Sequence, residues 1–159
     1  EVIRNTPLLV QLFIVFFGLP SLSIRLDALT AAMISFTVNL GAYSTEIVRA
    51  GLQAVPKSQI EAGHSLGLSS FQVFRYIILM PSLKMMYPAL ASQFVLLMLA
   101  TSIASQIAVP DLFHAASIIQ SRTFRDFEVY TVIGVLYLAL ALMLRGFFAV
   151  VYKVAFDRR

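Results

Sequence analysis

The stretch MMYPALASQFVLLMLATSIASQIAVP, residues 85–110, runs for 26 residues without a charged side chain. A helix needs about 20 such residues to cross roughly 30 Å of hydrocarbon. Three other uncharged stretches occur, at residues 5–24, 28–45 and 129–144. The last continues past Arg145 in apolar or neutral residues to Tyr152, and Arg145 can snorkel from one face of a helix. The sequence therefore predicts an all-α fold, a polytopic transmembrane helical bundle with about four spans.

The composition agrees with a membrane protein. Of the 159 residues, 59% are hydrophobic and 13% are charged, compared with about 45–50% and 25% in soluble domains. These proportions exclude a soluble enzyme, a disordered tail and a nucleic-acid-binding module. A soluble bundle with buried helices is disfavoured, because the long uncharged stretches leave few polar faces for a soluble surface. The chain has no cysteine, which excludes disulfides, thiol nucleophiles and cysteine-based metal sites.

The net charge of +4 is first a signal of topology. Four spans divide the loops into two sets with unequal numbers of basic residues. One set holds eight: Arg4, Arg49, Lys57, Arg75, Lys84, Lys153, Arg158 and Arg159. The other set holds three: Arg25, Arg122 and Arg125. Because basic residues concentrate in cytoplasmic loops, the sequence predicts that the segment between the second and third spans and the C-terminus are cytoplasmic.

The segment between the second and third spans is too polar to be a span and too long to be a turn. Pro56 opens a helix well, and Gly67 is a natural residue for its C-terminal end. Ser69 and Gln72 fit a capping box for a second helix, which we expect to end near Pro81. The pattern of residues 56–81 thus predicts a helix–glycine–helix unit. The residue pattern alone supports equally an interfacial connecting hairpin and a docking element for another protein.

The spacing Glu61-Ala62-x4-Gly67-x9-Ile77-x-Leu79 resembles the EAA loop of bacterial ABC-importer permeases, usually written EAA-x3-G-x9-I-x-L-P. In that family the loop forms coupling helices that fit a cleft of a cytoplasmic ATPase subunit. Two positions depart from the pattern. Gly63 stands where the second alanine is usual, and the proline comes one residue late, at Pro81. The resemblance assigns ATPase coupling to Glu61, Ala62, Gly63, Leu66 and Gly67.

Two further stretches are similar to polar amino-acid permeases of the same family. Arg4-Asn5-Thr6-Pro7-Leu8-Leu9-Val10-Gln11 resembles their R-G-T-P-L-L-V-Q segment, with Asn5 in place of glycine. Gly41-Ala42-Tyr43-x-x-Glu46-Ile47-x-Arg49, followed by Gly51, resembles their G-A-Y-x-x-E-I-x-R-x-G segment. The resemblance implies that residues 1–159 form one transmembrane permease domain of the type I ABC importer fold. Members usually have five spans, so it also implies that an N-terminal span is missing.

The resemblance implies a permease subunit of an ATP-driven importer of polar amino acids in the bacterial inner membrane. Its expected partners are cytoplasmic ABC ATPase subunits, a second permease subunit in a homo- or heterodimer, and a periplasmic or surface-tethered substrate-binding protein. The chain has no G-x-x-x-x-G-K-[ST] loop. We therefore expect no enzyme activity and no cofactor of its own, with ATP and Mg bound by the partner ATPase. The lipid bilayer is an expected partner, and nucleic acid is not.

Polar side chains within the spans predict a path for a polar solute, because they are costly in hydrocarbon unless they face a partner or water. The candidates are Asn39, Gln93, Thr101, Ser102, Ser105 and Gln106. Hydrogen bonding between helices is the alternative, favoured for Asn39 and equally weighted for the cluster at residues 101–106.

An ion-coupled secondary carrier or channel subunit is the competing function. It would require an ionisable residue within the membrane. The sequence offers only Glu46 and Arg145, both near span ends, and we interpret Glu46 as paired with Arg49. The two histidines, His64 and His114, fall on opposite sides of the predicted topology, so no shared metal site is expected.

Overall fold

The structure is a computed structural model that describes residues 1–156, and these residues form helices and connecting segments without a strand. The all-α prediction is therefore confirmed. A short N-terminal helix α1 (Leu8–Phe13) continues through a π-helical turn (Ile14–Gly18) and a 3-10 turn (Leu19–Leu22). The remaining elements, in chain order, are α2 (Ala28–Gln53), α3 (Lys57–Ser65), α4 (Ser70–Gln72), the π-helical segment η3 (Val73–Ile78), α5 (Leu79–Ala100), the 3-10 segment η4 (Thr101–Ile107), α6 (Leu112–Thr123) and α7 (Asp126–Phe156).

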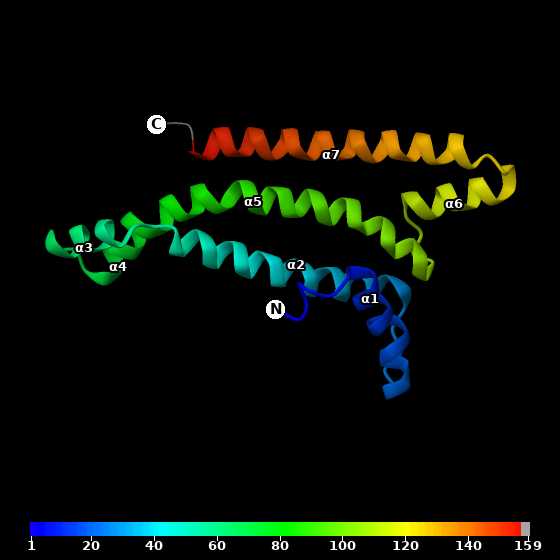
Figure 1. Cartoon of the computed structure of the whole chain (residues 1–159), viewed down its shortest axis with the longest axis horizontal. Coiled ribbons are helices and arrows are strands. Elements are labelled where there is room, and N and C mark those ends of the chain that lie inside the picture. Colours follow the sequence, from blue (N-terminus) through cyan, green and yellow to red (C-terminus); the bar gives the residue numbers. More distant parts are fainter. Residues whose placement is uncertain (157–159) are drawn as a thin grey trace.

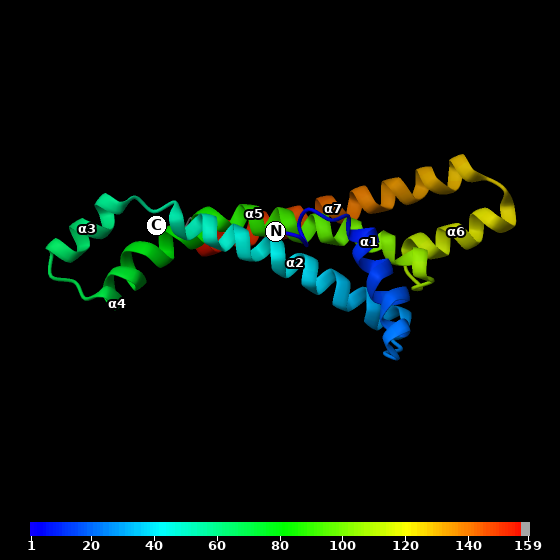
Figure 2. The same ribbon diagram turned by 60° about the horizontal axis from the view of Figure 1, so that its bottom comes forward.

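The three long helices lie along the same axis, with α5 packed against both α2 and α7 (Figures 1 and 2). The hairpin of α3 and α4 extends beyond one end of this layer, and α6 lies at the other end (Figure 1). Helix α7 ends on the hairpin side, as the charge distribution predicts for the C-terminal segment (Figure 1). Arg158 and Arg159, which belong to that charge count, lie outside the described residues.

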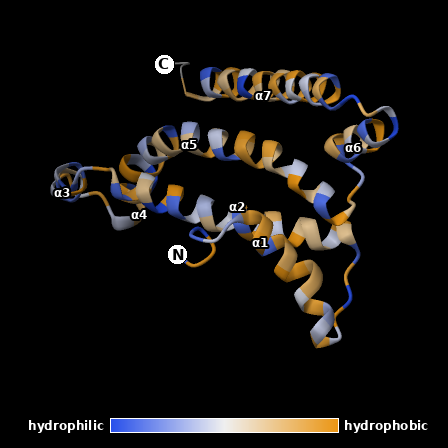
Figure 3. Ribbon diagram, turned by 45° about the vertical axis from the view of Figure 1, so that its right-hand side comes forward, coloured by the Kyte–Doolittle hydropathy of each residue, from blue (hydrophilic) through white to orange (hydrophobic). Residues whose placement is uncertain are grey.

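Two continuous helical segments are long and apolar enough to cross a membrane, Ser70–Ile107 and Asp126–Phe156. Hydrophobic residues predominate along α1 and in the middle of α5 and α7, whereas hydrophilic residues are frequent on α3 (Figure 3). The first predicted span is shorter than the sequence suggests, since its helix covers only Leu8–Leu22. Its α-helical part gives way to π and 3-10 turns around Gly18 and Pro20, and Ser23 ends it with a φ of 64°. The number of four spans remains a prediction.

The helix after the capping box does not end near Pro81, so that prediction is wrong. One helical segment runs from Ser70 to Ile107 and contains both Pro81 and Pro88. Proline lacks the N–H group that an α-helix uses, so a helix can carry it only where the hydrogen-bond pattern adjusts. The π-helical turns of η3 directly precede α5 and its Pro81, and they are such an adjustment.

Small side chains bring α2 and α5 close together. Gly51 and Ser82 are buried at this contact, and Ser82 is fully inaccessible. A Cβ atom placed on Gly51 would lie only 3.0 Å from the Cβ of Met86. Ser35, nearer the start of α2, is also buried, and its hydroxyl donates to the carbonyl oxygen of Ala31 at 2.8 Å within the same helix. Small residues are common where membrane helices pack, because the dispersion attraction between two helices increases as their backbones approach.

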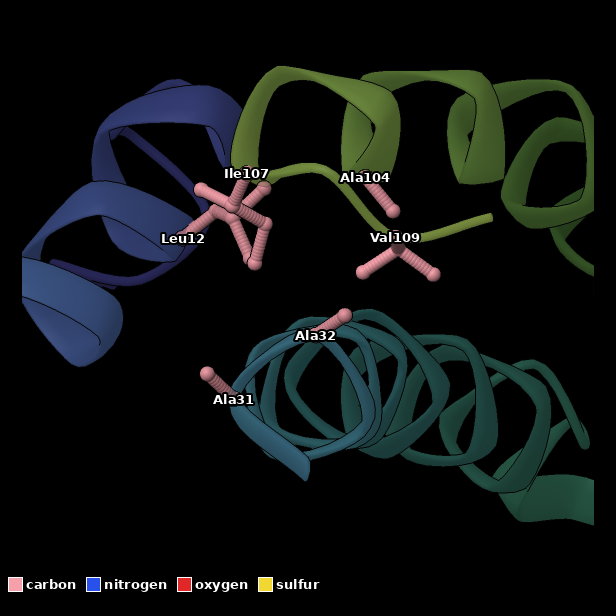
Figure 4. Close-up of a cluster of buried hydrophobic side chains, with 6 residues drawn as sticks. All are labelled: Leu12, Ala31, Ala32, Ala104, Ile107 and Val109. Carbon is pink, nitrogen blue, oxygen red and sulfur yellow. The ribbon is translucent and has the colours of Figure 1, made fainter. Parts of the chain in front are cut away.

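A cluster of buried hydrophobic side chains joins α1, α2 and the end of η4, at the opposite end from the hairpin. It consists of Leu12, Ala31, Ala32, Ala104, Ile107 and Val109 (Figure 4). Leu12 and Ile107 lie against each other, and Ala32 faces Val109 (Figure 4). Asp27 caps the start of α2, where its carboxylate accepts hydrogen bonds from the hydroxyl of Thr30 at 2.6 Å and its amide at 3.1 Å. These bonds, the hydroxyl one first, lower the pKa of the Asp27 carboxyl.

The close contact of α2 and α5 can be tested with Gly51→Leu. The added side chain would overlap Met86, and overpacking of this kind typically costs about 1–3 kcal/mol of the free energy of unfolding. We expect a lower melting temperature for the detergent-purified protein. Gly41→Leu is the matched control, because a Cβ on Gly41 of the same helix meets no atom within 4 Å. Equal melting temperatures for the two variants would contradict this packing.

Candidate functional site

The hairpin formed by α3, α4 and η3 depends on a glycine turn. Gly67 has a φ of +78°, in the left-handed region that favours glycine. Its amide donates to the carbonyl oxygen of His64 at 2.9 Å, and the amide of Leu68 donates to that of Gly63 at 3.2 Å. These two bonds form a Schellman motif, which satisfies carbonyl groups at the end of α3. The predicted role of Gly67 as the end of this helix is confirmed.

A capping box opens the second arm of the hairpin, as predicted. The side chain of Gln72 accepts a hydrogen bond from the amide of Ser69 at 2.9 Å. The Ser69 hydroxyl accepts one from the amide of Gln72 at 3.4 Å. These reciprocal bonds supply partners for two amides at the helix start that would otherwise lack them.

Gly63 lets the two arms of the hairpin approach each other. It is buried, and a Cβ in its place would lie 2.3 Å from Cδ1 of Ile77 and 3.2 Å from Cγ2 of Val73. Because Gly63 faces inward, the other side of α3 is exposed, including Glu61 and Ala62. The structure thus divides the predicted coupling residues: Gly63 and Gly67 shape the hairpin, while Glu61, Ala62 and Leu66 are available to a partner.

A polar cleft of about 550 Å³ lies between the N-terminal segment, α2 and α5. Asn39 of α2 and Gln93 of α5, both predicted for the solute path, line it. The other polar side chains that line it are Arg4, Asn5, Thr6 and Tyr43.

Gln11 organises one wall of this cleft. Its side-chain oxygen accepts a hydrogen bond from Nδ2 of Asn39 at 3.1 Å, and its Nε2 donates to the hydroxyl of Thr6 at 2.8 Å. Close by, the Tyr43 hydroxyl donates to the carbonyl oxygen of Arg4 at 3.1 Å. Asn39 therefore forms a hydrogen bond between helices, the role that the sequence favoured for it over a place in the solute path. It also borders the cleft. The prediction of a solute path did not include Gln11, although it is the only polar residue between Leu8 and Phe17.

The four polar residues at the end of the third predicted span do not line the cleft. The hydroxyls of Thr101, Ser102 and Ser105 donate to backbone carbonyl oxygens three residues earlier, at 2.7–2.8 Å. Gln106 is exposed. The three hydroxyls thus have local partners, at the end of α5 for Thr101 and Ser102 and within η4 for Ser105. No contact tests their assignment to a solute path, which remains a prediction.

A group of charges borders the cleft on its hairpin side. Glu46 accepts a hydrogen bond from the guanidinium of Arg49, as predicted, and Nη1 of Arg4 lies 3.4 Å from the same carboxylate oxygen. These three residues help to line a second hollow of about 400 Å³. Since Glu46 is paired with two arginines, it does not resemble the unpaired acid that an ion-coupled carrier would need.

The two histidines lie at opposite ends of the molecule, His64 on α3 and His114 on α6 (Figure 1). Among residues 1–156, no three His, Cys, Asp or Glu side chains gather where they could hold a metal ion.

Comparison with known proteins gives consistent matches. The profile of the family described as "Binding-protein-dependent transport system inner membrane component" matches residues 1–159. The L-cystine transport system permease protein TcyB of Bacillus subtilis is 43% identical over 120 residues, which cover 76% of this chain and 51% of that protein. The probable glutamine ABC transporter permease protein GlnP of the same organism is 38% identical over 159 residues, all of this chain and 70% of that protein.

The glutamine transport system permease protein GlnP of Escherichia coli is 37% identical over 146 residues, 91% of this chain and 67% of that protein. A solved structure, "Crystal structure of an amino acid ABC transporter with histidines", superposes with a TM-score of 0.88 at 38% identity. The match covers 96% of this chain and 72% of that one. The chain thus spans between about half and 70% of the length of these relatives. Its fold is that of an ABC-importer permease, as the sequence resemblance implies.

The glycine turn of the hairpin can be tested with Gly67→Val. A β-branched residue at a φ of +78° should cost about 1–2 kcal/mol. We expect hydrogen exchange at the amides of residues 67 and 68 to be faster, because those amides hold the turn together. Gly67→Asn is the control, since asparagine tolerates the left-handed region and should exchange at nearly the wild-type rate. Equal exchange in all three proteins would show that the turn does not depend on this conformation.

Proposed function

Because the chain belongs to the family of binding-protein-dependent transport system inner membrane components, we propose that it forms the membrane path of an ATP-driven importer of polar amino acids. The names of its relatives support this substrate class, since they are permeases of glutamine and cystine transport systems. The amides of Gln11, Asn39 and Gln93 at or beside the cleft also suit it. Together they offer hydrogen-bond donors and acceptors, and a polar amino acid needs both.

The observation that carries the proposal is the physical link between the hairpin and the cleft. One helical segment, Ser70–Ile107, begins in the exposed hairpin and contains Gln93 on the cleft wall. At a rise of 1.5 Å per residue, Gln72 and Gln93 lie about 30 Å apart along it. A continuous helix moves largely as a rigid element, so a partner that pulls the hairpin would also displace one wall of the cleft.

We propose that this partner is a cytoplasmic ABC ATPase, which contacts Glu61, Ala62 and Leu66 on the exposed face of α3. In this arrangement ATP and Mg are bound by the ATPase, and the permease itself hydrolyses nothing. A second permease subunit, identical or related, would complete the path. A periplasmic or surface-tethered binding protein would deliver the substrate at the α6 end. The excess of basic residues around the hairpin supports its location on the cytoplasmic side of the bacterial inner membrane.

The coupling role can be tested with Glu61→Lys in the full-length protein, purified with its partner subunits and reconstituted in proteoliposomes. Reversing an exposed charge on the docking face should lower the ATPase stimulation by substrate-loaded binding protein by roughly tenfold. Gln59→Lys is the control, because Gln59 is also exposed on α3 but lies one turn before the inward-facing Gly63.

The same preparation separates the importer from its alternative. If no separate ATPase accompanies the protein and uptake persists in ATP-depleted vesicles, the importer proposal fails. Glu46→Gln would then test an ion-coupled carrier.

The proposed path can be tested with Gln93→Leu, which removes a polar group from the cleft wall. The loss of one hydrogen bond to the substrate should lower amino-acid uptake about 3- to 10-fold. Thr37→Val is the matched control, because Thr37 is exposed on α2 and does not line the cleft. Ser105→Ala should leave uptake unchanged if the hydroxyls of η4 only bond their own helix. If uptake falls with Ser105→Ala but not with Gln93→Leu, the path runs along η4 and the cleft proposal is wrong.

A further inference from the structure

The polar cleft and the hollow beside Glu46 meet at one residue. The cleft, of about 550 Å³, borders α2 at Asn39 and Tyr43. The hollow, of about 400 Å³, borders α2 further along the helix, at Glu46 and Arg49. In the part of the chain that the structure describes, Arg4 is the one residue that lines both. It therefore stands at the boundary of the two spaces.

The hollow lies on the hairpin side of the cleft, and we call it the hairpin-side hollow. Helix α2 runs toward the hairpin and ends at Gln53, so Glu46 and Arg49 are closer to the hairpin than Asn39 is (Figure 1). The proposed importer releases its solute on that side of the membrane. A solute that moves from the cleft to the hairpin-side hollow has to pass Arg4.

Two contacts with α2 hold Arg4 at this boundary. Nη1 of Arg4 lies 3.4 Å from Oε2 of Glu46, and the carbonyl oxygen of Arg4 accepts a hydrogen bond from the hydroxyl of Tyr43 at 3.1 Å. Residues 1–7 are not helical, and they lie beside α2 in both views (Figures 1 and 2). The bond from Tyr43 fixes the backbone, whereas the ion pair fixes only the side chain. The guanidinium can therefore leave Glu46 while the segment stays in place.

The ion pair between Arg4 and Glu46 is suited to opening. The two side chains are 25% and 37% exposed, and ion pairs that water reaches are weak. When the guanidinium leaves, Glu46 keeps its hydrogen bond from Arg49, so the carboxylate is not left without a partner. Opening thus requires neither an unpaired buried charge nor a change of fold.

We propose that Arg4 and Glu46 form a gate on the hairpin side of the cleft and that this gate is closed in the structure. The inference rests on the proposed function, since it assigns a solute to the cleft. The gate opens when Arg4 swings away from Glu46. The two residues belong to different elements, the N-terminal segment and α2, so a movement of α2 and α5 driven at the hairpin separates them. The solute then passes into the hairpin-side hollow.

Arg4→Gln tests whether the ion pair closes the path. The full-length transporter with its partner subunits is reconstituted in proteoliposomes, and the leak of radiolabelled glutamine is measured without ATP. Loss of the ion pair favours the open state, and we expect the leak to rise about two- to fivefold. Arg49→Gln is the matched control, because it removes the same charge from the same carboxylate and Arg49 does not line the cleft. Its leak should equal that of the wild-type protein.

A reversible crosslink tests whether the gate has to open. The chain has no cysteine, so Arg4→Cys combined with Glu46→Cys provides one pair of thiols once the cysteines in the rest of the transporter are replaced. A short bifunctional methanethiosulfonate joins the two thiols, and dithiothreitol releases them. We expect the crosslink to abolish ATP-driven glutamine uptake and the reductant to restore it. Each single variant treated with the same reagent should keep its uptake.

The outcomes separate the gate from the proposed function. If the wild-type protein shows no ATP-driven uptake in these vesicles, both proposals fail. If it does, and Arg4→Gln leaks no more than the wild-type protein, the gate alone is wrong. An equal rise with Arg49→Gln would show that the leak reflects lost charge around Glu46 instead of an open gate. Uptake that continues through the crosslink would show that the path avoids this boundary. The melting temperature of Arg4→Gln shows whether this variant is folded, and the crosslink decides the proposal if it is not.

Discussion

The close contact between α2 and α5 supports the rest of the structure. Gly51 and Ser82 allow the two backbones to approach to a distance that larger side chains would prevent. In a membrane there is little hydrophobic gain when two apolar helices associate, so dispersion contacts between well-fitted surfaces must supply the stability. Because α2 carries Asn39 and α5 carries Gln93, this contact also sets the width of the polar cleft. Packing and the proposed transport path therefore depend on the same small residues.

The long helical segment from Ser70 to Ile107 changes in regularity along its length. Its ends are irregular, with π turns next to the hairpin and 3-10 turns at the opposite end, while α5 between them is regular. The irregular turns accommodate Pro81 and the hydroxyl groups of η4 without ending the helix. In the proposed mechanism, the regular middle transmits a displacement of the hairpin to the cleft. Such a segment suits an element that has to move and still remain packed.

Charges are handled differently on the two sides of α5. Beside the cleft, Glu46 is neutralised by Arg4 and Arg49, so the local cluster carries a single net positive charge. On the α7 side, Arg145 has no such partner among residues 1–156 and lies in an apolar groove. The first arrangement is complete within the chain. The second leaves Arg145 exposed on α7, where its long side chain can extend along the helix toward water.

The sequence by itself determined the all-α class, the hairpin and its two caps, because each depends on residues within a few positions of one another. Gly67 and the pair Ser69 and Gln72 act through local backbone bonds, so their roles were predictable. Only the tertiary structure decided that Gln11 bonds Asn39 and that Arg4 reaches Glu46, since these contacts join segments 28 and 42 positions apart. It likewise decided that α5 continues through Pro81. Distant contacts and a proline held within a helix depend on packing against other elements, and no local pattern in the sequence encodes that packing.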